Sequence, residues 1–250
     1  MIVPTFNERL SLEELVSRFF ETVSDWELLV VDDSSPDGTA DLCAELMRER
    51  SGVKLIRRTG SRGLGDAYLT GIRYGLDRGY DVIGTMDADL SHDPKYLPAL
   101  RRSLEANDVA IGSRYIRDGG TINWRIRRIL LSWLANRFAA RLLRVPAHDV
   151  TSGFRLYRAS ALARLPLESI RSSGYSFLVE LVYRLARAGC RIAEVPIVFY
   201  DRTLGESKLG RREIVRGAVN LVRLRLERDP GGSRSGGIRR GAGSRAHPGD

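Results

Sequence analysis

Two aspartates, Asp87 and Asp89, follow a short apolar run in the first half of the chain. The run covers residues 82–86 and comes after a turn-like Arg-Gly-Tyr-Asp segment, which predicts a buried strand. Ligands of open parallel α/β sheets bind just beyond the carboxyl ends of the strands. Two carboxylates in an Asp-x-Asp pattern can reach one hard cation, and Mg²⁺ and Mn²⁺ prefer such oxygen ligands. Because Mg²⁺ commonly completes its shell with substrate phosphates, the pattern indicates a site for a metal-held nucleoside diphosphate.

The same segment also fits a simpler interpretation, a solvated acidic turn that ends at Asp93-Pro94. An isolated Asp-x-Asp pair occurs in such turns more often than in metal sites. The choice between the two therefore depends on the rest of the chain.

Predicted strands and helices alternate on both sides of this pair. Strands are expected at residues 1–4, 28–31, 53–56 and 82–86, with helices at 12–22, 39–49 and 66–77 between them. This alternation predicts an α/β fold with a mostly parallel, right-handed, doubly wound sheet.

Two other motifs suggest rival functions. Gly63-x-Gly65 is the beginning of a dinucleotide-binding pattern, but Tyr68 replaces the third glycine and the loop follows the third strand instead of the first. A tight loop at a helix start explains these glycines better. Asp32-Asp33 after a strand is typical of the Mg²⁺ site of a receiver domain. In such domains the acidic pair follows the first strand, whereas here a strand and a helix precede it.

Composition limits the partners and the location. The chain has 250 residues, enough for one large α/β domain or two small ones. Its net charge of +9 favours phosphates, nucleic acid or an anionic membrane surface. Cys43 and Cys190 are far apart and fit no metal or redox spacing, so buried reduced thiols are expected. No leader segment or uncharged run of roughly 18 apolar residues is present, which predicts a soluble or peripheral protein.

Four motifs, taken in order, resemble an inverting family-2 glycosyltransferase of the GT-A fold. They are Val3-Pro4-Thr5-Phe6-Asn7-Glu8, residues 30–39, residues 86–94 and Gly112-Ser113-Arg114-Tyr115. The chain is most similar to polyprenol (dolichol) phosphate mannose synthases, over residues 1 to about 225. The resemblance implies metal-dependent transfer of mannose from GDP-mannose to a polyprenyl phosphate. A UDP-glucose donor remains an alternative, and so does a non-catalytic basic protein that binds phosphate or nucleic acid.

The resemblance also implies roles for individual residues. The base and ribose pocket is expected to contain Pro4, Phe6, Glu8, Val31 and Asp33. Phe6 stands where the family often has tyrosine, so ring stacking is kept and a hydroxyl is lost. Asp87, Ala88 and Asp89 are expected to bind the sugar nucleotide, with Asp87 and Asp89 as ligands of Mg²⁺ or Mn²⁺. A glutamine or glutamate often follows as a further ligand, and here Ser91 has that position; Ser91, a water or another group could complete the metal site.

Cationic side chains are the next requirement of this chemistry. The acceptor is already an anion, so it needs no strong general base but does need cations that hold its phosphate in line. Arg114 is the first candidate and Arg128 the second. In a loop that contains Gly205, Arg202 and Lys208 are expected to contact the diphosphate. Asp89, Arg114 and Arg202 are the expected catalytic residues. Arg155 is expected either to contact phosphate or to bridge carboxylates structurally.

Residues 123–144 combine Trp, Leu, Ile and Phe at helical spacing with interleaved arginines. This pattern fits a membrane-interface helix, and it fits equally an ordinary buried helix with a basic edge. The family resemblance favours the interface. The catalytic domain is expected to cover residues 1–228, followed by a disordered basic tail at 229–250. The protein is expected at the cytoplasmic face of the membrane, with or without a membrane-embedded partner protein and without a nucleic-acid partner.

Overall fold

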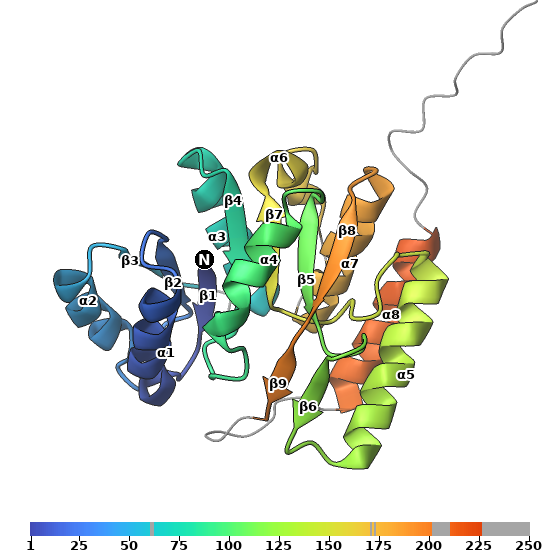
Figure 1. Ribbon diagram of the computed structural model, residues 1–250, viewed down its shortest axis with the longest axis horizontal. Coiled ribbons are helices and arrows are strands. Elements are labelled where there is room, and N and C mark those ends of the chain that lie inside the picture. Colours follow the sequence, from blue (N-terminus) through green and yellow to red (C-terminus); the bar gives the residue numbers. More distant parts are fainter. Residues whose placement is uncertain (61–62, 171, 173, 202–210, 227–250) are drawn as a thin grey trace, which may run out of the picture.

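The computed structural model describes residues 1–60, 63–170, 172, 174–201 and 211–226 (Figure 1). Arg202, Lys208 and the tail predicted at 229–250 lie outside these residues. Their predicted roles, and the domain boundary predicted at residue 228, stay predictions.

A seven-stranded sheet forms the centre of the molecule, in the order β3-β2-β1-β4-β7-β5-β8 (Figure 1). Its strands are β1 (Ile2–Thr5), β2 (Leu28–Asp32), β3 (Val53–Arg57), β4 (Val82–Thr85), β5 (Val109–Ser113), β7 (Arg155–Arg158) and β8 (Ile192–Pro196). β1 pairs in parallel with β2 and β4, β2 with β3, and β5 with β8. The predicted mostly parallel α/β sheet is therefore confirmed. The antiparallel strand β7, between β4 and β5, was not predicted.

Helices cover both faces of this sheet. They are α1 (Arg9–Thr22), α2 (Thr39–Glu49), α3 (Leu64–Asp77), α4 (Leu97–Ser103), α5 (Ile126–Leu143), α6 (Ala159–Leu162), α7 (Tyr175–Arg187) and α8 (Arg211–Leu226), with short 3₁₀ turns at Pro94–Tyr96 and Leu167–Ser169. Successive strand residues point to opposite faces. Val30 therefore joins the core beneath α1, α2 and α4, whereas Val31 joins the core beneath α3 and α7. Cys43 and Cys190 are buried free thiols, as predicted.

A second, two-stranded sheet lies beyond the end of the main sheet (Figure 1). It pairs β6 (Gly120–Ile122) in parallel with β9 (Val198–Tyr200). β6 leads into α5, and α5 lies beside α8 at the edge of the molecule. This small sheet was not predicted, because each of its strands has only three residues.

The helix predicted within residues 123–144 is α5, and it is not an ordinary buried helix. Its buried residues are Asn136, Ala139, Ala140 and Leu143, all in its second half. Most of its large apolar side chains face outward instead. No helix among the described residues is both long enough and apolar enough to span a membrane.

Candidate active site

The carboxyl ends of β2, β1 and β4 meet at one edge of the sheet, because the three strands are adjacent and parallel. Each is followed by a bend with a non-glycine residue of positive φ: Asn7 (62°), Ser34 (54°) and Leu90 (63°). Such left-handed conformations cost roughly 1–3 kcal/mol each and cluster at functional sites. This edge contains the predicted nucleotide-binding residues Pro4, Phe6, Glu8, Val31, Asp33, Asp87, Ala88 and Asp89. The side chain of Val31 lies in the core, so a contact with a nucleoside is left to its main chain.

Two buried side chains hold Asp87 in place. The Tyr68 hydroxyl donates to Asp87 Oδ1 (3.1 Å), and the peptide N–H of Asp87 donates to His92 Nδ1 (3.1 Å). Tyr68 stacks on Phe177, with ring centroids 5.9 Å apart. Burial lowers the pKa of His92 against the opposing pull of Asp87 and Asp89, so the ring is neutral and Nδ1 accepts. Neither Tyr68 nor His92 was predicted to support the site.

Asp89 is the more buried of the two aspartates. Its Oδ1 accepts hydrogen bonds from the peptide N–H of Ser91 (3.1 Å) and from the Ser91 hydroxyl. The Ser91 hydroxyl proton is therefore directed at Asp89, which leaves the hydroxyl oxygen lone pairs for a cation. Ser91 as a third metal ligand stays a prediction; what the structure adds is that it orients Asp89.

The donor set of this edge fits a magnesium or manganese ion that is shared with a substrate. No three His, Cys, Asp or Glu side chains group into a metal site within the part of the chain that the structure describes. Asp87 and Asp89 could offer two carboxylate oxygens to a cation, whereas His92 Nδ1 is engaged by a peptide N–H. Mg²⁺ is commonly held by one or two carboxylates, with waters and phosphates completing its shell. A structural zinc site would need four protein ligands.

The adjacent acids Asp32 and Asp33 have different tasks. Asp32 is fully buried and accepts from the Thr5 hydroxyl (2.9 Å), which braces β1 against β2. Asp33 lies 2.8 Å from Arg58 Nη1 and accepts from the peptide N–H of Gly63 (2.9 Å). Asp33 therefore links the bend after β2 to the loop after β3. Arg58 was not predicted, although its place after a strand of a parallel sheet was a usable signal.

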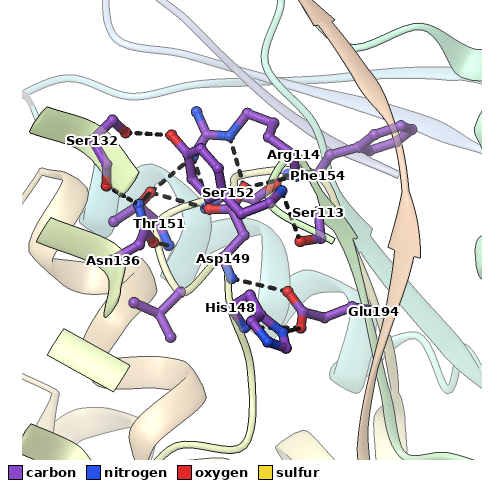
Figure 2. Close-up of polar contacts among 12 residues, drawn as sticks. Ser113, Arg114, Ser132, Asn136, His148, Asp149, Thr151, Ser152, Phe154 and Glu194 are labelled. Carbon is purple, nitrogen blue, oxygen red and sulfur yellow. Dashed lines mark hydrogen bonds and ion pairs between the residues drawn. The ribbon is translucent and has the colours of Figure 1, made fainter. Parts of the chain in front are cut away.

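Arg114 follows β5, whose carboxyl end lies at the same edge of the sheet as that of β4. Its guanidinium binds Asp149 through two parallel hydrogen bonds, Nε to Oδ2 (2.7 Å) and Nη2 to Oδ1 (2.8 Å) (Figure 2). The Arg114 side chain is 9% exposed and that of Asp149 is 0% exposed. Nη2 also donates to Thr151 Oγ1 (2.9 Å). This burial shows that Arg114 is not an ordinary surface arginine.

Each member of the Arg114–Asp149 pair stabilises the charged form of the other. Burial lowers the pKa of Arg114, but Asp149 more than offsets it, so the pKa of Arg114 is raised. Burial likewise raises the pKa of Asp149, and the charge and hydrogen bonds of Arg114 outweigh it, so the net pKa of Asp149 is lowered. Asp87 also contributes to raising the pKa of Arg114. The site therefore contains a permanently charged arginine that interacts with the first aspartate of the Asp-x-Asp pair.

Arg128 and Arg114 both lie beside the ring of Trp124. The Arg128 guanidinium stacks on Trp124 at 3.9 Å, and the Arg114 guanidinium lies 5.5 Å from the same ring. Arg128 Nη1 also donates to both carboxylate oxygens of Asp201 (2.9 and 3.0 Å). The structure thus brings the two predicted acceptor-side cations together.

Arg155 does not serve this site. It is fully buried, and its guanidinium donates to the carbonyl oxygens of Ser152 (2.7 Å), Leu178 (2.8 Å) and Val150 (2.6 Å). The predicted phosphate contact is therefore wrong, and so is the alternative of bridged carboxylates. Two of these carbonyl oxygens come from the turn at residues 150–153 and the third from α7, and together they satisfy the buried cation.

Comparison with known proteins identifies the family. The family model "Glycosyl transferase family 2" matches residues 1–165. Undecaprenyl-phosphate mannosyltransferase of Micrococcus luteus is 43% identical over 225 residues, which cover 90% of this chain and 93% of that protein. Polyprenol monophosphomannose synthase of Mycolicibacterium smegmatis is 42% identical over 237 residues, covering 92% and 89%.

Solved structures share the fold at low sequence identity. Glucosyl-3-phosphoglycerate synthase of Mycobacterium tuberculosis, in complex with Mn²⁺, UDP-glucose and phosphoglyceric acid, is 20% identical with a TM-score of 0.62, covering 92% of this chain and 80% of that one. A mannosyltransferase of Pyrobaculum calidifontis, in complex with GDP-Man and Mn²⁺, is 19% identical with a TM-score of 0.59, covering 89% and 61%. The sheet, the strand-end aspartates and the family match agree: this chain is a GT-A enzyme that belongs to glycosyl transferase family 2.

Proposed function

We propose that this glycosyltransferase transfers mannose from GDP-mannose to a polyprenyl phosphate at a membrane surface. The observation that carries the proposal is the pair of relatives with 43% and 42% identity, both named for polyprenyl-phosphate mannose synthesis. The similarity spans about nine-tenths of this chain in both cases. The strand-end carboxylates and the paired arginines of the site support the same chemistry.

The donor side of the reaction belongs to the edge formed by β2, β1 and β4. Phe6 and Asp33 would contact the nucleoside, and Asp87 and Asp89 would hold Mg²⁺ or Mn²⁺ with the diphosphate. When bound, this cation neutralises the charge that develops on the leaving diphosphate. Tyr68 and His92 fix the Asp87 carboxylate and its main chain beforehand. The site therefore needs little reorganisation as the charge develops.

The acceptor side belongs to Arg114 and Arg128. A phosphate oxygen of the lipid attacks the anomeric carbon of mannose, and the bond from that carbon to the diphosphate oxygen breaks to release GDP. No proton has to be removed from an acceptor that is already an anion. The arginines would hold the phosphate in line with the breaking bond, which inverts the anomeric centre. Arg202 and Lys208 are proposed to contact the diphosphate from a segment outside the described residues.

The location of the acceptor implies a location for the enzyme. A polyprenyl phosphate presents its phosphate at the bilayer surface, and we place this chain there as a peripheral protein of the cytoplasmic face. The outward apolar residues of α5 support this placement. A membrane-embedded partner protein is compatible with it.

A panel of donors and acceptors tests the proposal. GDP-mannose, UDP-glucose and UDP-galactose are each incubated with undecaprenyl or decaprenyl phosphate, with Mg²⁺ or Mn²⁺ present, and the lipid products are separated. We expect a mannosyl lipid from GDP-mannose alone. A glucosyl lipid from UDP-glucose would replace mannose in the proposal. Absence of every glycolipid from folded protein would favour a phosphate-binding protein without transferase activity.

A further inference from the structure

Exposed large apolar side chains are concentrated on one part of the molecule. Among the described residues twelve such side chains are exposed, and ten of them lie within residues 122–138 or 219–226. These ten are Ile122, Ile126, Leu130, Leu131, Trp133, Leu134, Phe138, Val219, Val222 and Leu226. On α5 they recur every four residues from 126 to 138, and on α8 at 219, 222 and 226, so each helix has an apolar stripe. The two helices lie side by side (Figure 1).

The same region is strongly cationic. Residues 119–148 contain six arginines and no aspartate or glutamate, and residues 211–226 contain five arginines and one glutamate. An exposed apolar stripe flanked by arginines is the composition of helices that lie in a membrane interface. Exposed aliphatic stripes of this kind do not match a nucleic-acid surface, where charged groups on the phosphates and stacked aromatic rings dominate.

A groove of about 360 Å³ lies beside the apolar stripe of α5. It runs along the second half of the helix and is lined by Trp133, Arg137, Arg141, Arg144 and His148, among others. None of the three arginines forms an ion pair with another described residue. Glu194 accepts from the ring of the lining residue His148 (2.7 Å), and it also accepts from the peptide N–H groups of residues 148 and 149. Among the described residues, the groove lining therefore contains positive charge and no carboxylate.

Arg144 occupies an unusual position for an arginine. It ends α5 in the left-handed conformation, with φ of 54°. Glycine is the common residue at this position because any Cβ is strained there. An ordinary reason for the nearby arginines is their attraction to the negative end of the helix, and the test has to separate this effect from ligand binding.

We propose that the groove beside α5 binds the phosphate of an anionic phospholipid headgroup when the apolar stripes of α5 and α8 lie against a bilayer. In this arrangement the apolar stripes enter the acyl boundary while Arg137, Arg141 and Arg144 lie at headgroup level. The proposal rests on the proposed function, since a lipid-linked acceptor brings the enzyme to a membrane. It adds a lipid site whose lining does not include the acceptor-side cations Arg114 and Arg128.

The contribution of α8 is tested with two exposed leucines. Leu226 on α8 is 75% exposed and Leu10 on α1 is 78% exposed, so glutamate at either position leaves the core intact. The full-length protein is co-sedimented with phosphatidylcholine vesicles that contain phosphatidylglycerol. We expect Leu226→Glu to lower vesicle binding about 10-fold or more, because a buried leucine side chain is lost from the bilayer contact. Leu10→Glu is expected to bind as the wild type does. Equal binding by both variants would overturn the role of α8.

The groove is tested with two matched pairs of arginines. Arg141→Gln with Arg144→Gln removes two charges at the end of α5, and Arg101→Gln with Arg102→Gln removes two charges from the last turn of α4. Each pair of substitutions removes two positive charges from the C-terminal end of a helix, so the two variants are matched in net charge and in the loss of favourable charge at a helix end. A basic residue near an anionic bilayer contributes about 1 kcal/mol, so the groove pair is expected to weaken binding roughly 30-fold. The α4 pair is expected to have a much smaller effect, and neutral vesicles are expected to show no difference. An equal loss for both pairs would overturn the headgroup site.

Two further measurements separate this inference from the proposed function. Mannosyl transfer to a water-soluble, short-chain polyprenyl phosphate should survive all of these substitutions. An active wild-type chain that binds no vesicles, but sediments as a dimer or binds RNA, would overturn the membrane surface and leave the proposed function standing. A wild-type chain that binds vesicles without transferring mannose would refute the proposed function alone.

Discussion

The buried pair of Arg114 and Asp149 leads to a quantitative prediction. Arg114→Ala leaves the Asp149 carboxylate at 0% exposure without its cation, and breaking a buried ion pair in this way costs about 3–5 kcal/mol. In a chain of this size each kcal/mol lowers the melting temperature by about 2–4 °C. We therefore expect Arg114→Ala to melt about 6–20 °C below the wild type. Transfer should be lost as well, because the proposed acceptor-side cation is gone.

Thermal unfolding and mannosyl transfer are measured on the same preparations. Arg57→Ala is the matched control, since Arg57 pairs with Asp41 at the surface, where both side chains are at least half exposed. Exposed pairs contribute about 0–1 kcal/mol, so the control should melt within about 4 °C of the wild type. Arg114→Lys keeps the charge but loses the two parallel hydrogen bonds, and it should fall between Arg114→Ala and the wild type in melting temperature. A wild-type melting temperature for Arg114→Ala would refute the reasoning, whatever happens to transfer.

The pKa of Asp149 gives the same pair a pH signature. Its pKa in the folded protein is lowered from an ordinary value of 3.8, so the unfolded chain takes up its proton first as the pH falls. The stabilisation from Asp149 is therefore complete above that value and is lost as the pH falls through the lower, folded pKa. Asp149→Asn should remove this part of the acid sensitivity in urea titrations between about pH 6 and pH 2. Identical pH dependence of the wild type and the variant would contradict the assignment.

Three other substitutions test the donor site and the membrane face. Asp89→Asn should keep the fold and lose most transfer at ordinary Mg²⁺ or Mn²⁺ levels; near-normal turnover would remove Asp89 from the metal site. Tyr68→Phe should weaken Mn²⁺ binding in the presence of GDP-mannose about 10-fold or more, because loss of an outer-shell hydrogen bond commonly has this effect. Calorimetry measures this affinity, and an unchanged value would contradict the role of the Tyr68 hydroxyl. Trp133→Glu should reduce vesicle binding and transfer to long-chain acceptors while sparing GDP-mannose binding; a collapsed fold would instead identify Trp133, 40% exposed here, as a core residue.

The first half of the fold was predictable because each strand is a short apolar run followed by polar residues. Helix α2 was predicted with the observed bounds, and α1 and α3 within about three residues. Strand β7 escaped prediction because Arg-Leu-Tyr-Arg shows no apolar run. Its first arginine is fully buried and satisfied by three carbonyl groups, which only the tertiary fold supplies. Local pattern cannot indicate such a partner.

The same limit applies to the site. Carboxylates at strand ends could be predicted, since parallel topology alone brings them together. The residues that hold them could not, because Tyr68 reaches Asp87 across 19 positions and Asp149 reaches Arg114 across 35. In the sequence, Tyr68 was evidence only against a dinucleotide-binding site, since it replaces the third glycine of that pattern. The glycine-rich loop turned out to precede the helix that supplies this hydroxyl to Asp87.

The start of α5 connects the two proposals, since it belongs both to the site and to the outer surface. Arg128, in the first turn, faces inward to Trp124 and Asp201, whereas Ile126, two residues earlier, is 82% exposed. Residues two apart on a helix point to nearly opposite sides, so the inward cation and the outward apolar stripe begin within one turn, about 5 Å along the axis. A polyprenyl phosphate whose chain lies along the stripe would therefore have its phosphate close to Arg128. Arg114 is also near, because both arginines lie beside the Trp124 ring. This geometry supports acceptor delivery from a bilayer without removing the polyprenyl chain from it.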